Sequence, residues 1–286
     1  MELTMTAARA GKLSSFLKNE LKMSTGLVNK VKWADGLRVN GLSCHTNYQV
    51  EPGDVIAVRL EEAQPEYPAE QGPLTVLFED DWLLAVDKPA GMLIHPSRNR
   101  ITGTLANLVQ GYYARTGQGA FHPLTRLDRD TFGIVLIAKN SHIHALLQQR
   151  KPRKTYEALV FGGPDGEAGL IDAPIARKEL PSLLREIRPD GKPSVTRYRV
   201  LERGAQVSRL ELEPVTGRTH QLRLHCAYMG FPILGDPQYG SEASMAFSRE
   251  RDFETQLLLA KRLEFIHPIT GQTMALESRM TLPELM

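Results

Sequence analysis

Residues 125–140 read TRLDRDTFGIVLIAKN and divide into a charged half and an apolar half. In the charged half, Arg126 and Arg129 alternate with Asp128 and Asp130. The apolar half, GIVLIAKN, has the length and β-branched content of a buried strand. A charged loop at the entrance of such a strand projects its side chains into a shared cleft, where charge pairing holds a carboxylate ionised. The alternative is a solvent-exposed turn in which Arg126 pairs with Asp130, or Asp128 with Arg129.

The rest of the chain mixes strand and helix patterns without a regular strand–helix–strand repeat. Helical spacing predicts helices around Thr104–Ala114 and at His142–Arg150, the second capped by Ser141. Strands are predicted at LTVLF, LLAV, KTYEALVFGG, VTRYRVLE and VSRLELEPV, and the QLRLH segment around Arg223 also has a strand pattern. These patterns favour an α+β fold with a mixed, largely antiparallel sheet.

Residues 11–60 form a small unit of their own. Apolar residues recur at helical spacing from Leu13 to Leu21, and Ser24 is placed to cap a second helix. An alternating strand then enters the Asn-Gly turn at residues 40–41, which is a strong hairpin signal. About fifty residues bury only a marginal core, so we expect this unit to pack on, or be tethered to, something larger.

Residues 61–73, EEAQPEYPAEQGP, separate this unit from the larger one at 74–286. The segment holds three prolines and four glutamates and lacks an apolar period. That composition predicts an extended acidic, proline-rich linker. Its negative charge makes it a poor contact for nucleic acid.

The charge distribution points to a polyanionic partner. The net charge of the chain is only +2, but residues 98–154 carry ten lysines and arginines against two aspartates. A basic block inside a nearly neutral protein indicates contact with phosphate backbones, although a solvated basic face is the simpler alternative. The run RKPRK at 150–154, with Arg98, Arg100 and Arg115, is assigned to contact with a phosphate backbone, with a solvated surface charge as the alternative for each residue.

Other features exclude several classes of protein. No stretch of 18 uncharged apolar residues could span a membrane, and the N-terminus lacks the pattern of a secretory signal. Two cysteines, Cys44 and Cys226, suit a reducing compartment, so we expect a cytoplasmic protein. The chain has no phosphate-binding or dinucleotide fingerprint, and its histidines lack zinc-ligand spacing. We therefore expect no metal and no cofactor, and chemistry carried by carboxylate and arginine.

Five segments, in order along the chain, resemble the RluA/RluD family of RNA pseudouridine synthases. RLDRDTFG in the opening stretch is similar to the family's catalytic signature, and LLAVDKPAGMLIHP and RKTYEALV resemble its first and tyrosine motifs. VTGRTHQLRLHCAYMGFPILGDPQYG and LLLAKRLEFIHPITG resemble its two C-terminal motifs. Residues 11–60 separately resemble the S4-like RNA-binding domain of a small-subunit ribosomal protein. The resemblance implies a pseudouridine synthase fold at 74–286 with a small N-terminal α/β RNA-binding domain.

The resemblance also implies an activity and roles for four residues. Asp128 matches the catalytic aspartate, which acts either as nucleophile or as base. Arg126 matches the arginine that fills the space left by the flipped uridine, Tyr156 the tyrosine that stacks on the target base, and Arg223 the cation paired with the carboxylate. The substrate is then a uridine in ribosomal or transfer RNA, modified without metal or nucleotide cofactor by a monomer.

Three positions depart from the family pattern. Thr125 stands where the family usually has His, Phe132 where it has Ser, and Leu259 where a His is common. These changes put the choice of substrate, or the shape of the pocket mouth, in question. Two other functions remain open: an RNA-binding protein that kept the fold without activity, and a metal-dependent RNA hydrolase using Asp128 and Asp130.

Overall fold

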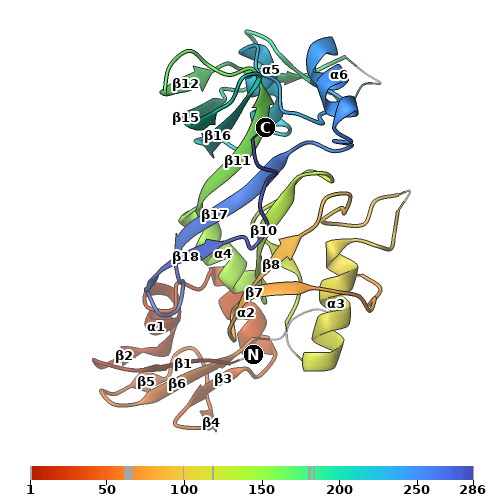
Figure 1. The fold of residues 1–286 in the computed structure, drawn as a ribbon. Coiled ribbons are helices and arrows are strands. Elements are labelled where there is room, and N and C mark those ends of the chain that lie inside the picture. The colour runs from red at the N-terminus through yellow and green to blue at the C-terminus, as the bar shows by residue number, and fades with distance from the viewer. Residues whose placement is uncertain are drawn as a thin grey trace.

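The computed structural model describes residues 2–60, 67–98, 100–117, 119–179, 182 and 184–285. Figure 1 shows a small N-terminal unit, coloured red to orange, and a larger body built on one long sheet. Among the described strands most pairs are antiparallel and one is parallel, which confirms the predicted α+β class. No helix in these ranges is long and apolar enough to cross a membrane.

The N-terminal unit is a four-stranded antiparallel sheet with two helices. Its strands follow the order β1 (Glu2–Thr6), β6 (Val55–Arg59), β3 (Leu37–Val39), β4 (Leu42–Ser43). The helices are α1 (Leu13–Asn19) and α2 (Thr25–Trp33), and β2 (Gly11–Lys12) pairs with β5 (Gln49–Val50). Buried residues of both helices and of the sheet share one core.

Two local predictions for this unit are confirmed. The Ser24 hydroxyl caps α2 by accepting a hydrogen bond from the main chain of Leu27 at 3.2 Å. Asn40 and Gly41 both have positive φ, 51° and 80°, and join β3 to β4. Positive φ at both central residues defines the tight hairpin turn that Asn-Gly favours, because its twist matches that of the strands.

The structure also extends the unit beyond the predicted range. β1 precedes residue 11 and pairs along its length with β6, and Leu3 is buried in the core. A five-residue strand whose partner lies about fifty residues later has too little local signal to be predicted alone. Trp82 packs against this core and against the core of the larger body, so the two units are in contact.

The predicted linker is only partly described, since residues 61–66 lie outside the described ranges. Residues 67–73 lie along helix α3 (Leu105–Thr116): the main chain of Glu70 donates to the carbonyl of Asn107, and Tyr67 packs on the main core. A Cβ at Gly111 would overlap the carbonyl of Glu70, so the close approach requires glycine in this helix. This half of the acidic segment is therefore packed against the larger body.

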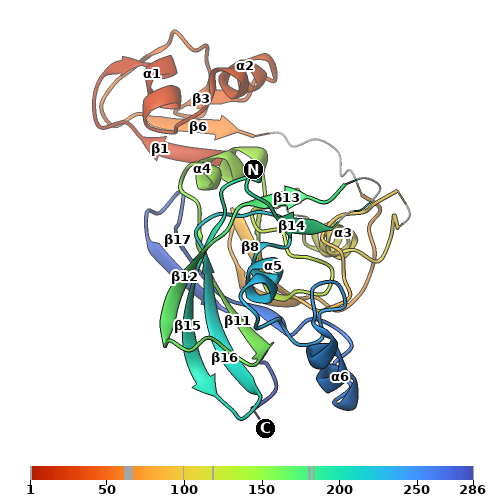
Figure 2. The same cartoon turned by 90° about the horizontal axis from the view of Figure 1, so that it is seen from above.

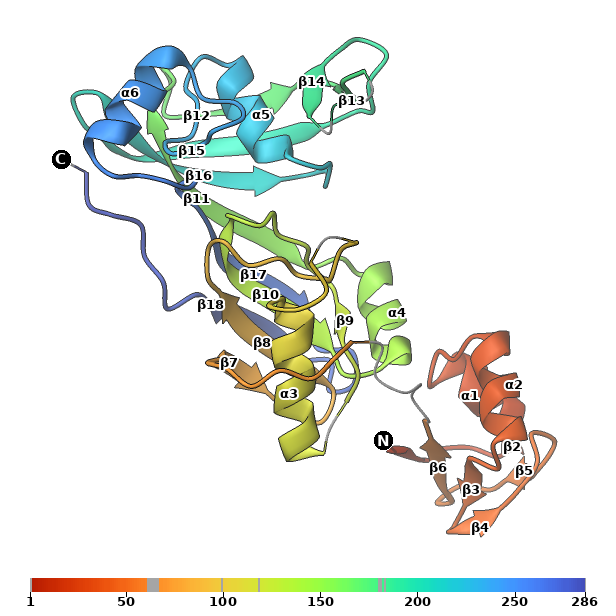
Figure 3. The ribbon, with the colours of Figure 1, turned by 90° about the vertical axis from the view of Figure 1, so that its right-hand side faces the viewer.

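The large sheet runs from one end of the body to the other. In spatial order its strands are β12 (Ala168–Asp172), β15 (Val195–Arg203), β16 (Val207–Pro214), β11 (Arg153–Phe161), β17 (Leu258–Ile266), β10 (Phe132–Ala138), β8 (Leu83–Lys88) and β7 (Thr75–Glu79). β18 (Thr273–Glu277) pairs with β17, and β9 (His122–Pro123) pairs with β10. A separate hairpin joins β13 (Ile175–Arg177) to β14 (Arg185–Ile187). Figure 3 shows β11 and β17 running between the two ends of the sheet.

The two ends meet at the short parallel contact of β10 with β17. Phe132 pairs there with Leu259, and Gly133 with Ala260. Gly133 has φ 104°, and a Cβ at this position would overlap the backbone of Ala260. The glycine after the charged loop therefore lets two strands approach at the point where the loop enters the sheet.

Helices cover both faces of the sheet. α3 and α5 (Gln221–Tyr228) contribute to one core, and α4 (Ser141–Gln149) contributes to the core on the other face. β8 shows the division, because Leu84 and Val86 belong to the first core and Leu83 and Ala85 to the second. α6 (Glu242–Glu250) packs at the far end of the body, as Figure 2 shows from above.

Two local predictions were wrong. Asn140, one residue before Ser141, caps α4 by accepting a hydrogen bond from the main chain of Ile143 at 2.8 Å. The QLRLH segment around Arg223 begins helix α5 instead of a strand. Its alternation of apolar and polar residues imitates a strand, but every position from Gln221 to Cys226 is buried, so no solvent face sets a helical period.

Candidate active site

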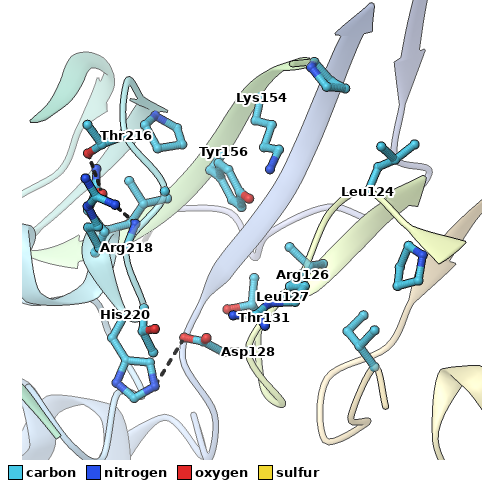
Figure 4. A pocket seen from close by; sticks show the side chains of 18 of the residues that line it. Leu124, Arg126, Leu127, Asp128, Thr131, Lys154, Tyr156, Thr216, Arg218 and His220 are labelled. Atoms are coloured by element: carbon cyan, nitrogen blue, oxygen red, sulfur yellow. Dashed lines mark hydrogen bonds and ion pairs between the residues drawn. The ribbon is translucent and has the colours of Figure 1, made fainter. Parts of the chain in front are cut away.

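A cleft of about 950 Å³ opens where the charged loop, the start of β11 and the segment before α5 converge. All four residues singled out from the sequence line it: Arg126, Asp128, Tyr156 and Arg223. They come from the loop before β10, from β11 and from α5. Figure 4 shows Arg126, Asp128, Tyr156, Lys154 and His220 around the same opening. The fold thus brings residues about a hundred positions apart to one place.

Asp128 and Arg223 are paired. Nη1 of Arg223 donates to Oδ2 of Asp128 at 3.1 Å. The Asp128 side chain is 30% exposed and therefore open to the cleft, whereas that of Arg223 is 5% exposed. None of the described residues donates a hydrogen bond to Oδ1 of Asp128. One carboxylate oxygen is held by the guanidinium, and the other is available to a molecule in the cleft.

A second carboxylate holds the guanidinium from behind. Asp236 accepts from Nε and Nη2 of Arg223, both at 2.7 Å, and Gln238 accepts from Nη2 at 2.8 Å. Burial opposes the charge on Arg223, but hydrogen bonds and the charges of Asp236 and Asp128 outweigh it and raise the pKa of the guanidinium. The fork geometry of arginine suits this arrangement, because one edge binds Asp236 while the remaining Nη1 reaches the cleft.

Tyr156 is buried beside the carboxylate. The register of β11 against β17 shifts between Thr155 and Tyr156, and such a bulge re-aims the side chain that follows it. Tyr156 belongs to the main core with Ala158 and Val160, as the predicted alternation requires, and its ring also lines the cleft. Burial and the charge of Asp128 raise its pKa, so the phenol is protonated at neutral pH.

Positive charge surrounds the single carboxylate of the cleft lining. Arg126, Lys151, Lys154 and Arg218 all line it, and Asp128 is its one acidic residue within the described ranges. Arg126 is exposed and makes no hydrogen bond or ion pair with any described residue. The arrangement can accommodate a polyanion while presenting one carboxylate oxygen to it.

Comparisons with known proteins decide the family. A family model described as RNA pseudouridylate synthase matches residues 82–228. The chain is 33% identical over 284 residues to ribosomal large subunit pseudouridine synthase C of Vibrio cholerae, covering 93% of this chain and 89% of that protein.

The chain belongs to the RNA pseudouridylate synthase family. It is 37% identical to the uncharacterized RNA pseudouridine synthase YlyB of Bacillus subtilis, covering 86% of this chain and 82% of that one. Among solved structures, human RNA pseudouridylate synthase domain containing 1 superposes with a TM-score of 0.59 at 25% identity, covering 76% of this chain and 94% of that one. The protein is accordingly an RNA pseudouridine synthase, and its cleft is the candidate site of that reaction.

Two of the three departures from the family pattern are partners in this synthase. Phe132 and Leu259 are paired across the parallel strands, and Phe132 packs on the core that contains Leu259. Neither lines the cleft. The two apolar residues therefore meet at one site behind the charged loop, outside the cleft lining. Thr125 is buried, and its hydroxyl accepts a hydrogen bond from the main chain of Leu136.

Lys88 is a residue of the synthase that sequence reasoning missed. It is fully buried, and its ammonium donates to the carbonyls of Pro89, Met92 and Arg129, each at 2.9 Å. Burial lowers its pKa to about 8, against the opposing charges of Asp130 and Asp128. Lys88 therefore fastens the loop that carries Asp128 to the end of β8. A lysine close behind the apolar run LLAV, in VDKPAG, was the available signal.

The ion pairs considered for the charged loop do not form. Arg129 pairs with Asp130 through two hydrogen bonds of 2.9 Å, which leaves Arg126 and Asp128 to the cleft. Asp130 is not among the cleft-lining residues. No group of three or more His, Cys, Asp or Glu side chains in the described ranges is arranged to hold a metal ion.

Proposed function

We propose that this synthase isomerises specific uridines of large-subunit ribosomal RNA in the cleft around Asp128. The observation that carries the proposal is the Asp128–Arg223 pair at 3.1 Å, open to a cleft in which the other charged side chains are lysines and arginines. Relatives named for ribosomal large subunit RNA support this choice, including synthase D of Vibrio cholerae at 36% identity over 78% of this chain. Transfer RNA is the substrate that the first test can return instead.

The proposed reaction needs no cofactor. The bond from C1′ of the ribose to N1 of uracil breaks, the base turns, and C5 bonds to C1′. The proton on C5 leaves and N1 gains one, so atoms and electrons balance without an oxidant. Asp128 serves either as the nucleophile at C1′ or as a base and electrostatic partner of an oxocarbenium-like centre. In both cases its free oxygen faces the sugar.

The target base has to leave its stack before Asp128 can reach the ribose. Extrusion of a base costs on the order of a few kcal/mol, and stacking on an aromatic ring returns roughly 1–3 kcal/mol. We assign that stacking to Tyr156, whose ring lines the cleft next to Asp128. We assign Arg126 to the space that the flipped base leaves, because it is exposed at the cleft and makes no bond with a described residue.

The remaining domain assignments are part of the same proposal. The N-terminal unit, predicted at 11–60 and extended by β1, acts as an S4-like RNA-binding domain. Residues 61–73 connect it to the catalytic domain at 74–286, with 67–73 packed on the larger body. Exposed Lys30, Lys32 and Trp33 at the end of α2 support RNA contact by the N-terminal unit. Two weakly binding units on one chain gain affinity through effective concentration. We expect a cytoplasmic monomer.

Mapping pseudouridines in total RNA from cells with and without the gene tests the substrate. We expect one or a few sites in large-subunit ribosomal RNA to lose the modification and to regain it on complementation. Loss confined to transfer RNA would replace the proposed substrate. A second assay uses RNA labelled with tritium at C5 of uridine. Release of tritium without chain cleavage, and unaffected by a chelator, would exclude the metal-dependent hydrolase. Retention of tritium by RNA that is bound would indicate a non-catalytic protein.

A further inference from the structure

His220 and Tyr239 form a second line of contacts to Asp128, beside Arg223. Nε2 of His220 lies 4.0 Å from Oδ2 of Asp128, and its Nδ1 lies 2.9 Å from the hydroxyl of Tyr239. That hydroxyl is 2.9 Å from the main-chain nitrogen of Arg185, the first residue of β14. Figure 4 marks the contact of His220 with Asp128 by a dashed line. A chain of contacts thus links the β13–β14 hairpin to the catalytic loop.

The direction of the hydrogen bonds follows from the first donor. The main-chain N–H of Arg185 can only donate, so the Tyr239 oxygen accepts. Its own proton is available to Nδ1 of His220, and the carboxylate of Asp128 opposite Nε2 favours the imidazole proton on Nε2, so that Nδ1 accepts. A neutral imidazole that accepts at Nδ1 carries its proton on Nε2. The N–H of His220 therefore faces Asp128.

The ring is neutral in this arrangement. Burial lowers the pKa of His220, and Arg223 and Arg185 add to the lowering, against the opposing charges of Asp128 and Asp236. Burial raises the pKa of Tyr239, so its hydroxyl keeps its proton. The donor at Nε2 thus depends on Tyr239 and not on protonation of the ring.

We propose that Tyr239 and His220 are positioning residues that orient Asp128, an inference that rests on the proposed role of Asp128. Oδ2 is held by Arg223 and faced by the Nε2–H of His220, which leaves Oδ1 for the ribose. The separation of 4.0 Å closes to a hydrogen bond with a movement of about 1 Å, as catalytic contacts commonly do when substrate binds.

The backbone of His220 provides a way to separate this role from a structural one. Its φ is 57°, in the left-handed region that asparagine adopts more readily than histidine or glutamine. A purely structural role predicts that His220→Asn is tolerated at least as well as His220→Gln. The positioning role predicts the reverse, because the amide of glutamine reaches the place of Nε2, whereas that of asparagine reaches only the place of Nδ1.

Kinetics on an unmodified transcript of large-subunit ribosomal RNA test the proposal. We expect Tyr239→Phe to lower kcat about tenfold with KM within twofold, and His220→Gln to exceed His220→Asn in kcat severalfold. Tyr112→Phe is the matched control: its hydroxyl binds Glu79 away from the cleft, so kcat is unchanged. Parent-like kcat in Tyr239→Phe, or His220→Asn equal to or better than His220→Gln, would overturn the positioning role.

Nitrogen NMR of ¹⁵N-histidine-labelled full-length protein tests the tautomer without relying on activity. The resonances of His220 are assigned by their loss in His220→Gln. We expect the neutral Nε2–H form in the parent and a shift toward a mixture in Tyr239→Phe. A parent ring in the Nδ1–H form would overturn the inference. Absence of tritium release in the parent would instead reject the proposed substrate. The NMR result would still decide whether Tyr239 sets the tautomer of His220.

Discussion

Two arginine–carboxylate pairs of this molecule differ in burial, and we expect them to differ in their contribution to stability. Arg223 and Asp236 meet beneath the cleft with side chains 5% and 1% exposed. Arg199 and Glu211 meet across β15 and β16 through similar hydrogen bonds, with side chains 61% and 33% exposed. The outer pair is screened by water and contributes little, whereas the inner pair cannot lose a member without leaving a buried charge. Burial, more than the hydrogen bonds themselves, therefore determines how much stability is lost when the Arg223–Asp236 pair is broken.

The largest effect is expected at the one carboxylate that the buried network presents to the cleft. Asp128→Asn keeps the shape of the side chain but removes its charge, so we expect RNA binding near the parent level and a loss of tritium release of at least about 10³-fold. Asp130→Asn is the control, since among the described residues Asp130 forms its ion pair with exposed Arg129 alone. Activity of Asp128→Asn near that of Asp130→Asn would remove Asp128 from the chemistry.

A direct contrast of the two pairs comes next. Asp236→Asn leaves the guanidinium of Arg223 with a neutral partner in a buried site, and we expect a loss of unfolding free energy of about 3–5 kcal/mol. Glu211→Gln removes the same charge from the exposed pair and should change stability by less than about 1 kcal/mol. Urea unfolding of both variants measures the difference. Equal losses would mean that exposure does not distinguish the pairs.

Lys88 is a buried charged group whose contribution to stability depends on pH. Its pKa of about 8 in the folded protein lies below the roughly 10.4 of an unfolded lysine. Between these values the unfolded chain binds more protons, so stability rises with pH by up to about 3 kcal/mol from this group. Lys88→Met should lack that rise, as measured by urea unfolding at pH 7.5 and 9.5. The same pH dependence of stability in the parent and the variant would contradict the lowered pKa of Lys88.

The smallest effect is expected for the aromatic ring beside the buried network. Tyr156→Phe retains the stacking face and should keep kcat/KM within a few-fold of the parent. Tyr156→Ala loses the stacking contribution of roughly 1–3 kcal/mol, which corresponds to about a 5- to 150-fold reduction in kcat/KM. Tritium release under subsaturating RNA measures both. If the alanine variant matched the phenylalanine variant, Tyr156 would not contact the base.

Sequence reasoning reached the residues that face the cleft but not those that support them. The roles of Asp128, Tyr156 and Arg223 were assigned because their segments resemble motifs of the family, and of the three only Tyr156 lies on a strand. The partners Asp236 and Lys88 act through tertiary contacts with residues 13 and 41 positions away. Their burial is a property of the folded chain, so a single sequence offers only weak signals for them.

The wrong local predictions have the same physical origin. A helix buried on nearly all sides, such as α5, has no polar face to set its period, so its alternating residues resemble a strand. Asn140 and Ser141 are adjacent and both suit an N-cap, so the choice between them depends on a shift of one residue in the start of the helix. β1 was missed because its partner β6 lies about fifty residues later in the chain, so no local pattern indicates the pairing.

The position of Trp82 gives the protein a built-in optical probe. The chain has two tryptophans, of which Trp33 is 82% exposed and Trp82 packs where the N-terminal unit meets the larger body. In a Trp33→Phe background the remaining indole reports on that junction alone. Its emission should redden if the two units part and stay blue if they move as one. A change at this junction on addition of RNA can therefore be followed by intrinsic fluorescence, without an attached dye.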